Sequence, residues 1–117
     1  MIQDPTQTDG DKYKVIFENE KVRVLEYTDK PGEKTHEHHH PDSLMYFLSD
    51  FKRQLSANGK TAVIDGKQGT VSWLKEQNHT GANIGNTDTH VLLIELKENK
   101  NNLSTPDNVP LGPENLS

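Results

Sequence analysis

A regular alternation of short apolar runs and tight turns is the feature that most constrains the fold of this chain. Runs rich in β-branched and aromatic residues recur at residues 13–17, 21–28, 44–49, 51–56, 61–65, 70–75 and 90–97. Turn signals separate them, and Asn58-Gly59 is the strongest short hairpin signal among these. No segment of useful length between them has apolar residues at helical spacing. Short strands at a spacing of about 8–12 residues predict an all-β sandwich or barrel.

The length of 117 residues indicates one domain. We expect residues 1–12 to form a polar N-terminal lead-in, or an arm that pairs late, and residues 13–97 to form the barrel. Residues 98–117 are rich in Pro and Asn, so we expect a loose tail or an extended strap. Within the barrel, we expect residues 78–89 to be a loop with short extended pieces.

Composition narrows the classes of partner and compartment. The net charge of −5 argues against a nucleic-acid or anionic-membrane partner, since both need clustered Lys and Arg. The chain has no cysteine, which excludes thiolate metal sites and disulfides, and no visible signal peptide, so we expect a cytoplasmic protein. Hydrophobic residues make up only 30% of the chain, and this modest core favours a homodimer.

Four of the six histidines fall within the five residues "HEHHH" at positions 36–40. Neutral imidazole binds divalent transition metals, and residues i and i+2 of a strand point to one face. Two pairs are therefore available, His36 with His38 and His38 with His40, while His39 would face away. Two ligands hold a metal weakly, so a third must come from elsewhere in the chain.

The region around these histidines resembles the first motif of the cupin family. In "PGEKTHEHHHPDS", Gly32 is followed by five residues and then by His38 and His40 in the order His-x-His. The resemblance, taken together with the second motif, covers about residues 20–97. It implies a single-domain cupin β-barrel, which is a jelly roll or double-stranded β-helix.

The segment "GTVSWLKEQNHTGANIGNT" resembles the second cupin motif. Gly69 can open it, and His79, three residues and Asn83 close it. The two motifs in this order imply that His38, His40 and His79 converge inside the barrel as metal ligands. The cofactor expected there is one divalent transition metal, with Fe, Mn, Ni, Cu and Zn all open.

The chain departs from the family pattern at several positions. The Glu ligand of the first motif is missing, because its place falls at Met45 or at Ser43 depending on the direction of counting. Asp42 is the nearest carboxylate. Lys75 and Gln77 replace the expected proline and glycine of the second motif. The resemblance therefore implies a three-histidine centre with positions open to water, as metal-assisted catalysis requires.

His36 and Asp42 each have a structural and a functional interpretation. His36 is either a surface residue near the barrel mouth or a fourth ligand or proton shuttle. Asp42 either caps the turn after Pro41 or reaches the metal. His90 begins an apolar strand, and we expect it to be a structural residue.

Four residues are candidate contacts to a substrate, and each also has a structural reading. Arg53 faces either solvent or an anionic ligand in the barrel, because a buried Arg is costly without a partner. Tyr46 is either core wall or a substrate contact, and Asn83 either fixes the turn near His79 or touches the substrate. Trp73 could line a pocket. We otherwise expect apolar side chains to fill the barrel, namely Met45, Phe47, Trp73, Leu92 and Ile94.

These features lead to one preferred function and two alternatives. We expect a metal-binding protein that acts as a non-haem dioxygenase-type oxidoreductase on a small organic acid. The first alternative is a non-catalytic module that binds a small ligand or only a metal. The second alternative is an isomerase or lyase of the same fold, since fold alone does not select the reaction.

Overall fold

The computed structural model describes residues 3–97, and strands account for most of them. The described elements are one short helix and nine strands: α1 (Pro5–Thr8), β1 (Tyr13–Glu18), β2 (Val22–Asp29), β3 (His38–His40), β4 (Ser43–Phe47), β5 (Phe51–Ala57), β6 (Lys60–Gly66), β7 (Val71–Leu74), β8 (Gln77–Asn83) and β9 (Thr89–Leu96). This confirms the all-β prediction. Across residues 3–97, no helix is long and apolar enough to cross a membrane.

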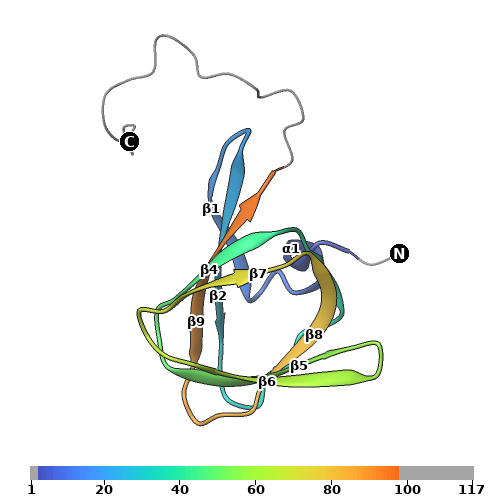
Figure 1. The fold of residues 1–117 in the computed structure, drawn as a ribbon, viewed down its shortest axis with the longest axis vertical. Helices are drawn as coiled ribbons and strands as arrows, with labels where there is room; N and C mark the ends of the chain where they lie inside the picture. The colour runs from blue at the N-terminus through green and yellow to red at the C-terminus, as the bar shows by residue number, and fades with distance from the viewer. Residues whose placement is uncertain (1–2, 98–117) are drawn as a thin grey trace.

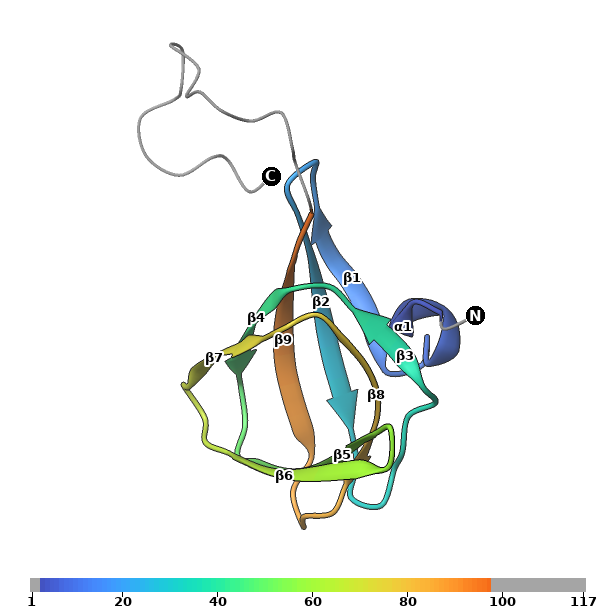
Figure 2. The same ribbon diagram turned by 45° about the vertical axis from the view of Figure 1, so that its right-hand side comes forward.

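The strands form two antiparallel sheets that face each other around one interior (Figures 1 and 2). One sheet has the strand order β1-β2-β9-β4-β7, and the other has the order β3-β8-β5-β6. The crossovers between the sheets make the chain a jelly-roll barrel. The hairpin of β1 and β2 extends beyond the barrel at one end (Figure 1).

Alternation along the strands decides which side chains enter the barrel. On β9 the buried positions are Thr89, Val91, Leu93 and Glu95, and the residues between them are more exposed. Leu92 and Ile94 therefore lie on the outer face, so the expectation that they fill the barrel is wrong by one residue of register. Leu25, Phe47 and Phe51 form the core with Tyr13, Tyr27, Leu74, Val91 and Leu93.

The turn between β5 and β6 shows how local chemistry sets the strand pairing. Asn58 and Gly59 have φ angles of 51° and 76°, which are the left-handed values that a two-residue type I′ hairpin requires. Ala57 consequently pairs with Lys60.

The prediction of a loop with short extended pieces over residues 78–89 is wrong in its first half, because β8 occupies Gln77–Asn83. Its polar composition and the internal Gly81 hid a strand that is paired on both edges.

The segment before β1 contains α1 and lies against β3 (Figure 2). Asp4 caps α1 by accepting a hydrogen bond from the Thr6 backbone N–H at 2.9 Å, and Pro5 occupies the first turn. Gln3 forms a bridge to β3, where its carbonyl accepts a hydrogen bond from His39 N–H at 3.0 Å. The predicted C-terminal tail, residues 98–117, lies outside the described residues.

Candidate metal centre

Three histidines from two neighbouring strands meet inside the barrel. His38 on β3 pairs directly with His79 on β8, and His40 lies two residues along β3 on the same face. Their candidate ligand atoms all lie within 4.8 Å of one another. All three residues are buried. The spacing i, i+2 and the register between two strands are enough to bring them together.

The outward-facing nitrogen of each ring has an acceptor beside it. His38 Nδ1 lies 2.8 Å from the His36 carbonyl oxygen, and His79 Nδ1 lies 2.7 Å from Gln77 Oε1. His40 Nδ1 faces Glu95 Oε2 at 3.5 Å, and neither atom has a hydrogen-bond partner among the described residues. At His38 and His79 the acceptors favour the tautomer with the proton on Nδ1, which leaves the lone pair on Nε2 free. This is the arrangement that metal-ligating histidines use.

Burial keeps the imidazoles of His38 and His79 neutral. It lowers the pKa of His38 to about 4, and the neighbouring His40 adds to this shift. Burial lowers the pKa of His79 to about 3, again with a contribution from the nearby His40 and His38. Both rings therefore hold the neutral form that binds metal at pH 7.

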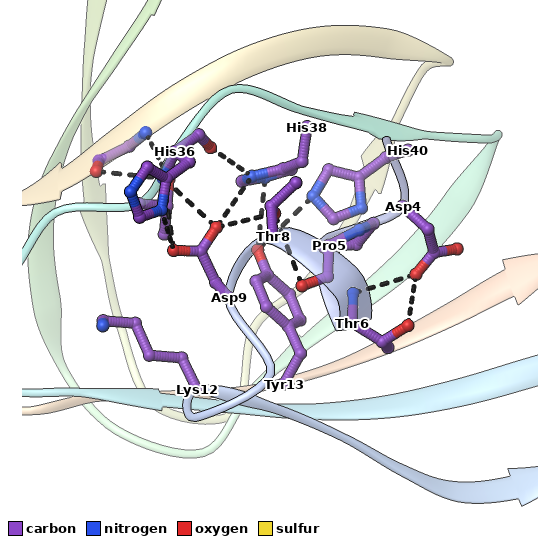
Figure 3. A network of polar contacts seen from close by, with 12 residues as sticks. Asp4, Pro5, Thr6, Thr8, Asp9, Lys12, Tyr13, His36, His38 and His40 are labelled. Carbon is purple, nitrogen blue, oxygen red and sulfur yellow. Dashed lines mark hydrogen bonds and ion pairs between the residues drawn. The ribbon is translucent and has the colours of Figure 1, made fainter. Parts of the chain in front are cut away.

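Tyr13 is a fourth member of the cluster that the sequence analysis missed. Its hydroxyl oxygen lies 3.4 Å from Nε2 of His38 and 3.4 Å from Nε2 of His40 (Figure 3). Burial raises the pKa of the Tyr13 hydroxyl far above its usual value. We call Tyr13, His38, His40 and His79 the histidine cluster. No spacing in the sequence links Tyr13 to the histidines, because it arrives from β1 in the opposite sheet.

Two buried carboxylates lie behind the ligand candidates. Asp9, which is only 2% exposed, lies with Oδ2 3.8 Å from His38 Nδ1 and accepts hydrogen bonds from the His36 backbone N–H (Figure 3). Glu95 faces His40 with Oε2, and its Oε1 accepts a hydrogen bond from Arg23 Nε at 2.8 Å. Glu95 had a sequence signal, because it is a charged residue within an apolar run. Asp9 had none.

The remaining histidines and Asp42 lie outside this centre. The His36 side chain is 81% exposed, with Nδ1 3.1 Å from Asp9 Oδ1. His39 points away and lies 2.6 Å from Asn78 Oδ1, and His90 pairs with Glu26 at 2.7 Å. Asp42 accepts a hydrogen bond from the Glu76 backbone N–H at 2.8 Å, so it fixes a turn in this structure.

The two positions proposed for the missing Glu hold no carboxylate. Met45 lines the cavity, and Ser43 is fully buried with its hydroxyl donating to the Pro41 carbonyl at 2.7 Å. Neither side chain is a good ligand for a hard divalent ion. The strand that supplies this ligand in the family pattern therefore supplies none in this chain.

A cavity of about 140 Å³ lies beside the three histidines. Apolar side chains form most of its wall, including Met45, Phe47 and Leu93, and Arg53 contributes to it as well. A cavity of about 150 Å³ holds a molecule the size of benzene. The space is therefore suited to a ligand of only a few heavy atoms.

Arg53 belongs to a second polar group in the barrel. Its side chain is buried, which rules out the solvent-facing reading, and it forms an ion pair with Asp29. Its guanidinium carbon also lies 4.9 Å from the centroid of the Tyr27 ring. We call Arg53, Asp29, Tyr27, Asn83 and Thr89 the arginine cluster.

Asp29 is the centre of the arginine cluster. It accepts hydrogen bonds from Tyr27 Oη at 2.5 Å and from Asn83 Nδ2 at 3.0 Å. Burial acts to raise the pKa of Asp29, but these donors and the Arg53 charge hold it below its usual value. Asn83 also bonds the Thr87 carbonyl at 2.9 Å, so it ties β8 to the following turn.

Tyr46 and Trp73 lie differently from the other candidate substrate contacts. Tyr46 alternates with the inward residues of β4 and is 38% exposed, so its side chain lies on the outer face. Trp73 contributes to the cavity wall, yet it is 51% exposed and pairs with the outward Leu44. Because cross-strand partners share a face, we place the indole on the outer face.

Comparison with solved structures identifies similar folds. A cupin domain from Bordetella pertussis Tohama I is 24% identical, with a TM-score of 0.69 over 74% of this chain and 92% of that chain. A conserved protein with a double-stranded β-helix domain from Klebsiella pneumoniae is 20% identical, with a TM-score of 0.59 over 72% of this chain and 70% of that one.

A third similar structure is an RmlC-like cupin family protein with a double-stranded β-helix fold from Methanocaldococcus jannaschii. It is 11% identical, with a TM-score of 0.58 over 72% of this chain and 77% of that chain. No protein-family model and no curated protein matches the chain. At these identities the likeness concerns the fold, so the chemistry must be argued from the site itself.

Proposed function

We propose that this chain, which has the cupin double-stranded β-helix fold, binds one divalent transition metal through His38, His40 and His79. One observation carries the proposal. Three buried imidazoles bring their candidate ligand nitrogens within 4.8 Å of one another, while the Nδ1 atoms of His38 and His79 each lie beside an acceptor. Buried lone pairs without donors cost free energy, and a cation bound among them removes that cost.

The residues present fit such an ion. Three neutral nitrogen donors are typical of catalytic zinc sites and suit iron, copper and nickel as well. The bound metal would supply a Lewis acid with open coordination positions and, if redox-active, a centre for O₂ chemistry. Glu95 and Gln77 would hold the rings of His40 and His79 in the ligating orientation.

We further propose a dioxygenase-type oxidoreductase that acts on a small organic acid. The cavity beside the histidines supports a small substrate, since its volume is about 140 Å³. Arg53 supports an acid, because it is a cationic residue among those that line the cavity. Asp29 already pairs with Arg53, so a substrate carboxylate would share the guanidinium rather than neutralise a free charge.

The metal content of untagged protein tests the first proposal. We expect about one Fe, Mn, Ni, Cu or Zn ion per chain by inductively coupled plasma mass spectrometry. Replacing His38 and His79 together with Ala should abolish it. His90→Ala is the matched control, because His90 pairs with Glu26 on the outer face and should leave the metal content unchanged.

Other outcomes separate the alternatives. Full metal occupancy in the His38→Ala, His79→Ala double variant would contradict the ligand assignment. Protein that takes up no added divalent ion would favour the non-catalytic module. Metal-loaded protein that consumes O₂ with small organic acids, measured with an oxygen electrode, would support the dioxygenase. Turnover of such acids without O₂ consumption would favour the isomerase or lyase.

We also propose a homodimer formed through the outer face of the five-stranded sheet. Cross-strand partners line up there in one apolar row: Phe17, Val24, Ile94, Leu44 and Trp73. Trp73 is 51% exposed and Phe17 is 44% exposed. This row carries no charge, and a two-fold axis would bring the same row from a second copy onto it.

Sedimentation equilibrium tests the dimer. Trp73→Asp places a charge in the row and should convert a dimer to a monomer. Val63→Asp is the control, because Val63 is 55% exposed on β6 of the other sheet. A monomeric native protein, or a dimer that survives Trp73→Asp but not Val63→Asp, would contradict this interface.

A further inference from the structure

We propose that the Tyr13 hydroxyl oxygen is the fourth protein ligand of this metal, in place of the carboxylate that the first motif lacks. This inference rests on the proposed metal site and deepens it. It makes the N-terminal end of β1 part of the centre. A centre with four protein ligands also leaves fewer open positions than one with three.

The distances around Tyr13 fit a shared ion better than a hydrogen bond. Hydroxyl donors lie about 2.7–2.9 Å from their acceptors, whereas Tyr13 Oη lies 3.4 Å from both His38 Nε2 and His40 Nε2. Two donors of a tetrahedral ion, each about 2.0–2.1 Å from it, lie about 3.4 Å apart. Tyr13 Oη keeps this separation from two different nitrogens at once.

Proton counting at the cluster gives the same result. Hydrogen-bond acceptors beside Nδ1 leave the Nε2 lone pairs of His38 and His79 free, and His40 Nδ1 faces a carboxylate oxygen at 3.5 Å. The hydroxyl of Tyr13 carries one proton and can satisfy only one of the two nitrogens that it touches. The group therefore has more acceptors than donors, and a cation removes the imbalance.

The fold holds Tyr13 at this point from several sides. Its ring centroid lies 4.5 Å from that of Tyr27 and 5.6 Å from that of His38. Its backbone N–H donates to the Asp9 carbonyl at 3.1 Å. The short segment from α1 to β1 thus places Asp9 behind His38 and Tyr13 in front of it (Figure 3). A ligand fixed in this way needs little reorganisation on binding.

Ligation by Tyr13 changes the charge of the site. The phenolic proton leaves to solvent when the oxygen binds the metal, as with other protein ligands that must be deprotonated. Three neutral imidazoles and one phenolate then hold the divalent ion, so the net charge falls from +2 to about +1. A carboxylate in the same place would have the same effect on charge. Tyr13 therefore compensates for the loss of the Glu at Ser43 or Met45.

Copper(II) added to the metal-free full chain is the probe. A phenolate bound to Cu(II) gives a ligand-to-metal charge-transfer band in visible light, which imidazole ligands alone do not give. We expect this band in the native protein and its loss in Tyr13→Phe, together with a 10-fold or greater weakening of Zn(II) affinity by competition titration. Tyr46→Phe is the control and should match the native protein, since Tyr46 lies on the outer face.

The results distinguish failure of this inference from failure of the metal site. Native protein that binds Cu(II) without the band, or Tyr13→Phe with unchanged band and Zn(II) affinity, overturns ligation by Tyr13 and leaves the three histidines standing. Native protein that binds neither ion overturns the metal site itself. Thermal unfolding of metal-free Tyr13→Phe checks the fold, and we expect a single cooperative transition at a moderately lower temperature, because the ring is retained but one donor to the histidines is lost.

Discussion

The barrel interior holds two clusters of polar side chains that differ in how far their groups are paired. In the arginine cluster, Asp29 meets Arg53, Tyr27 Oη and Asn83, so its charge and its lone pairs are satisfied within the protein. In the histidine cluster, the groups that face inward are nearly all acceptors, and Tyr13 offers the one proton.

This difference separates a structural network from a binding site. A buried polar network with every group paired rigidifies a core, whereas buried acceptors without donors are costly. The arginine cluster therefore needs no ligand to be stable. The histidine cluster is stabilised by an occupant that supplies positive charge without adding acceptors. The predictions below test each half of this contrast.

The largest effect on stability should come from breaking the arginine cluster. Asp29→Ala leaves the Arg53 guanidinium buried without its counter-charge, which typically costs about 3–5 kcal/mol. Urea denaturation of the metal-free protein measures this. Asp65→Ala is the control, because the Asp65 side chain is 69% exposed and should change stability by less than about 0.5 kcal/mol. Similar losses in both variants would mean that the arginine cluster is not a structural network.

Altering the carboxylate behind His40 should weaken metal binding without removing a ligand. Glu95→Gln keeps the shape but removes the negative charge that faces His40 Nδ1 at 3.5 Å. Loss of such outer partners typically lowers metal affinity about 10–100-fold. Zn(II) competition titration measures the change, and Glu26→Gln on the outer face is the matched control. Equal affinity in native protein and Glu95→Gln would remove Glu95 from the centre.

The pH dependence of metal-free protein should report the buried neutral histidines. The folded protein lowers the pKa of His38 to about 4 and of His79 to about 3, below the unfolded value near 6.5. Between about pH 6.5 and 4 the unfolded chain therefore binds more protons, and stability falls as pH falls. Each group adds a slope of up to about 1.4 kcal/mol per pH unit.

Urea denaturation at several pH values measures this slope. His38→Gln should flatten the profile between pH 6.5 and 4, because one titrating group is gone. His36→Gln is the control, since the His36 side chain is 81% exposed. A profile of the native protein that stays flat down to pH 4 would show that the histidines are not held neutral by the fold.

The sequence predicted the elements that depend on local patterns. The i, i+2 spacing of His38 and His40 and the hairpin signal at Asn58-Gly59 both depend on neighbouring residues, and both match the structure. The outward position of Leu92 could not be read from its run, because "HVLLIELK" is apolar at consecutive positions. Register across β2, β9 and β4 decides which of its residues face inward.

The partners that complete the two clusters were beyond sequence reasoning for a different reason. Tyr13 reaches His38 across 25 residues of chain, and Asp29 reaches Asn83 across 54. No spacing rule links these positions, since the contacts arise only when the two sheets face each other. Glu95 was also missed, although a charge inside an apolar strand can signal a buried partner.

Anomalous diffraction at the absorption edge of the bound metal tests the central contrast most directly. Crystals grown with one equivalent of Zn(II) should show a single strong peak within about 2.0–2.1 Å of Nε2 of His38, His40 and His79, with no peak in the arginine cluster. A barrel interior without a peak, or metal only at the surface residues His36 and His39, would contradict the proposal that the histidine cluster is built for a cation.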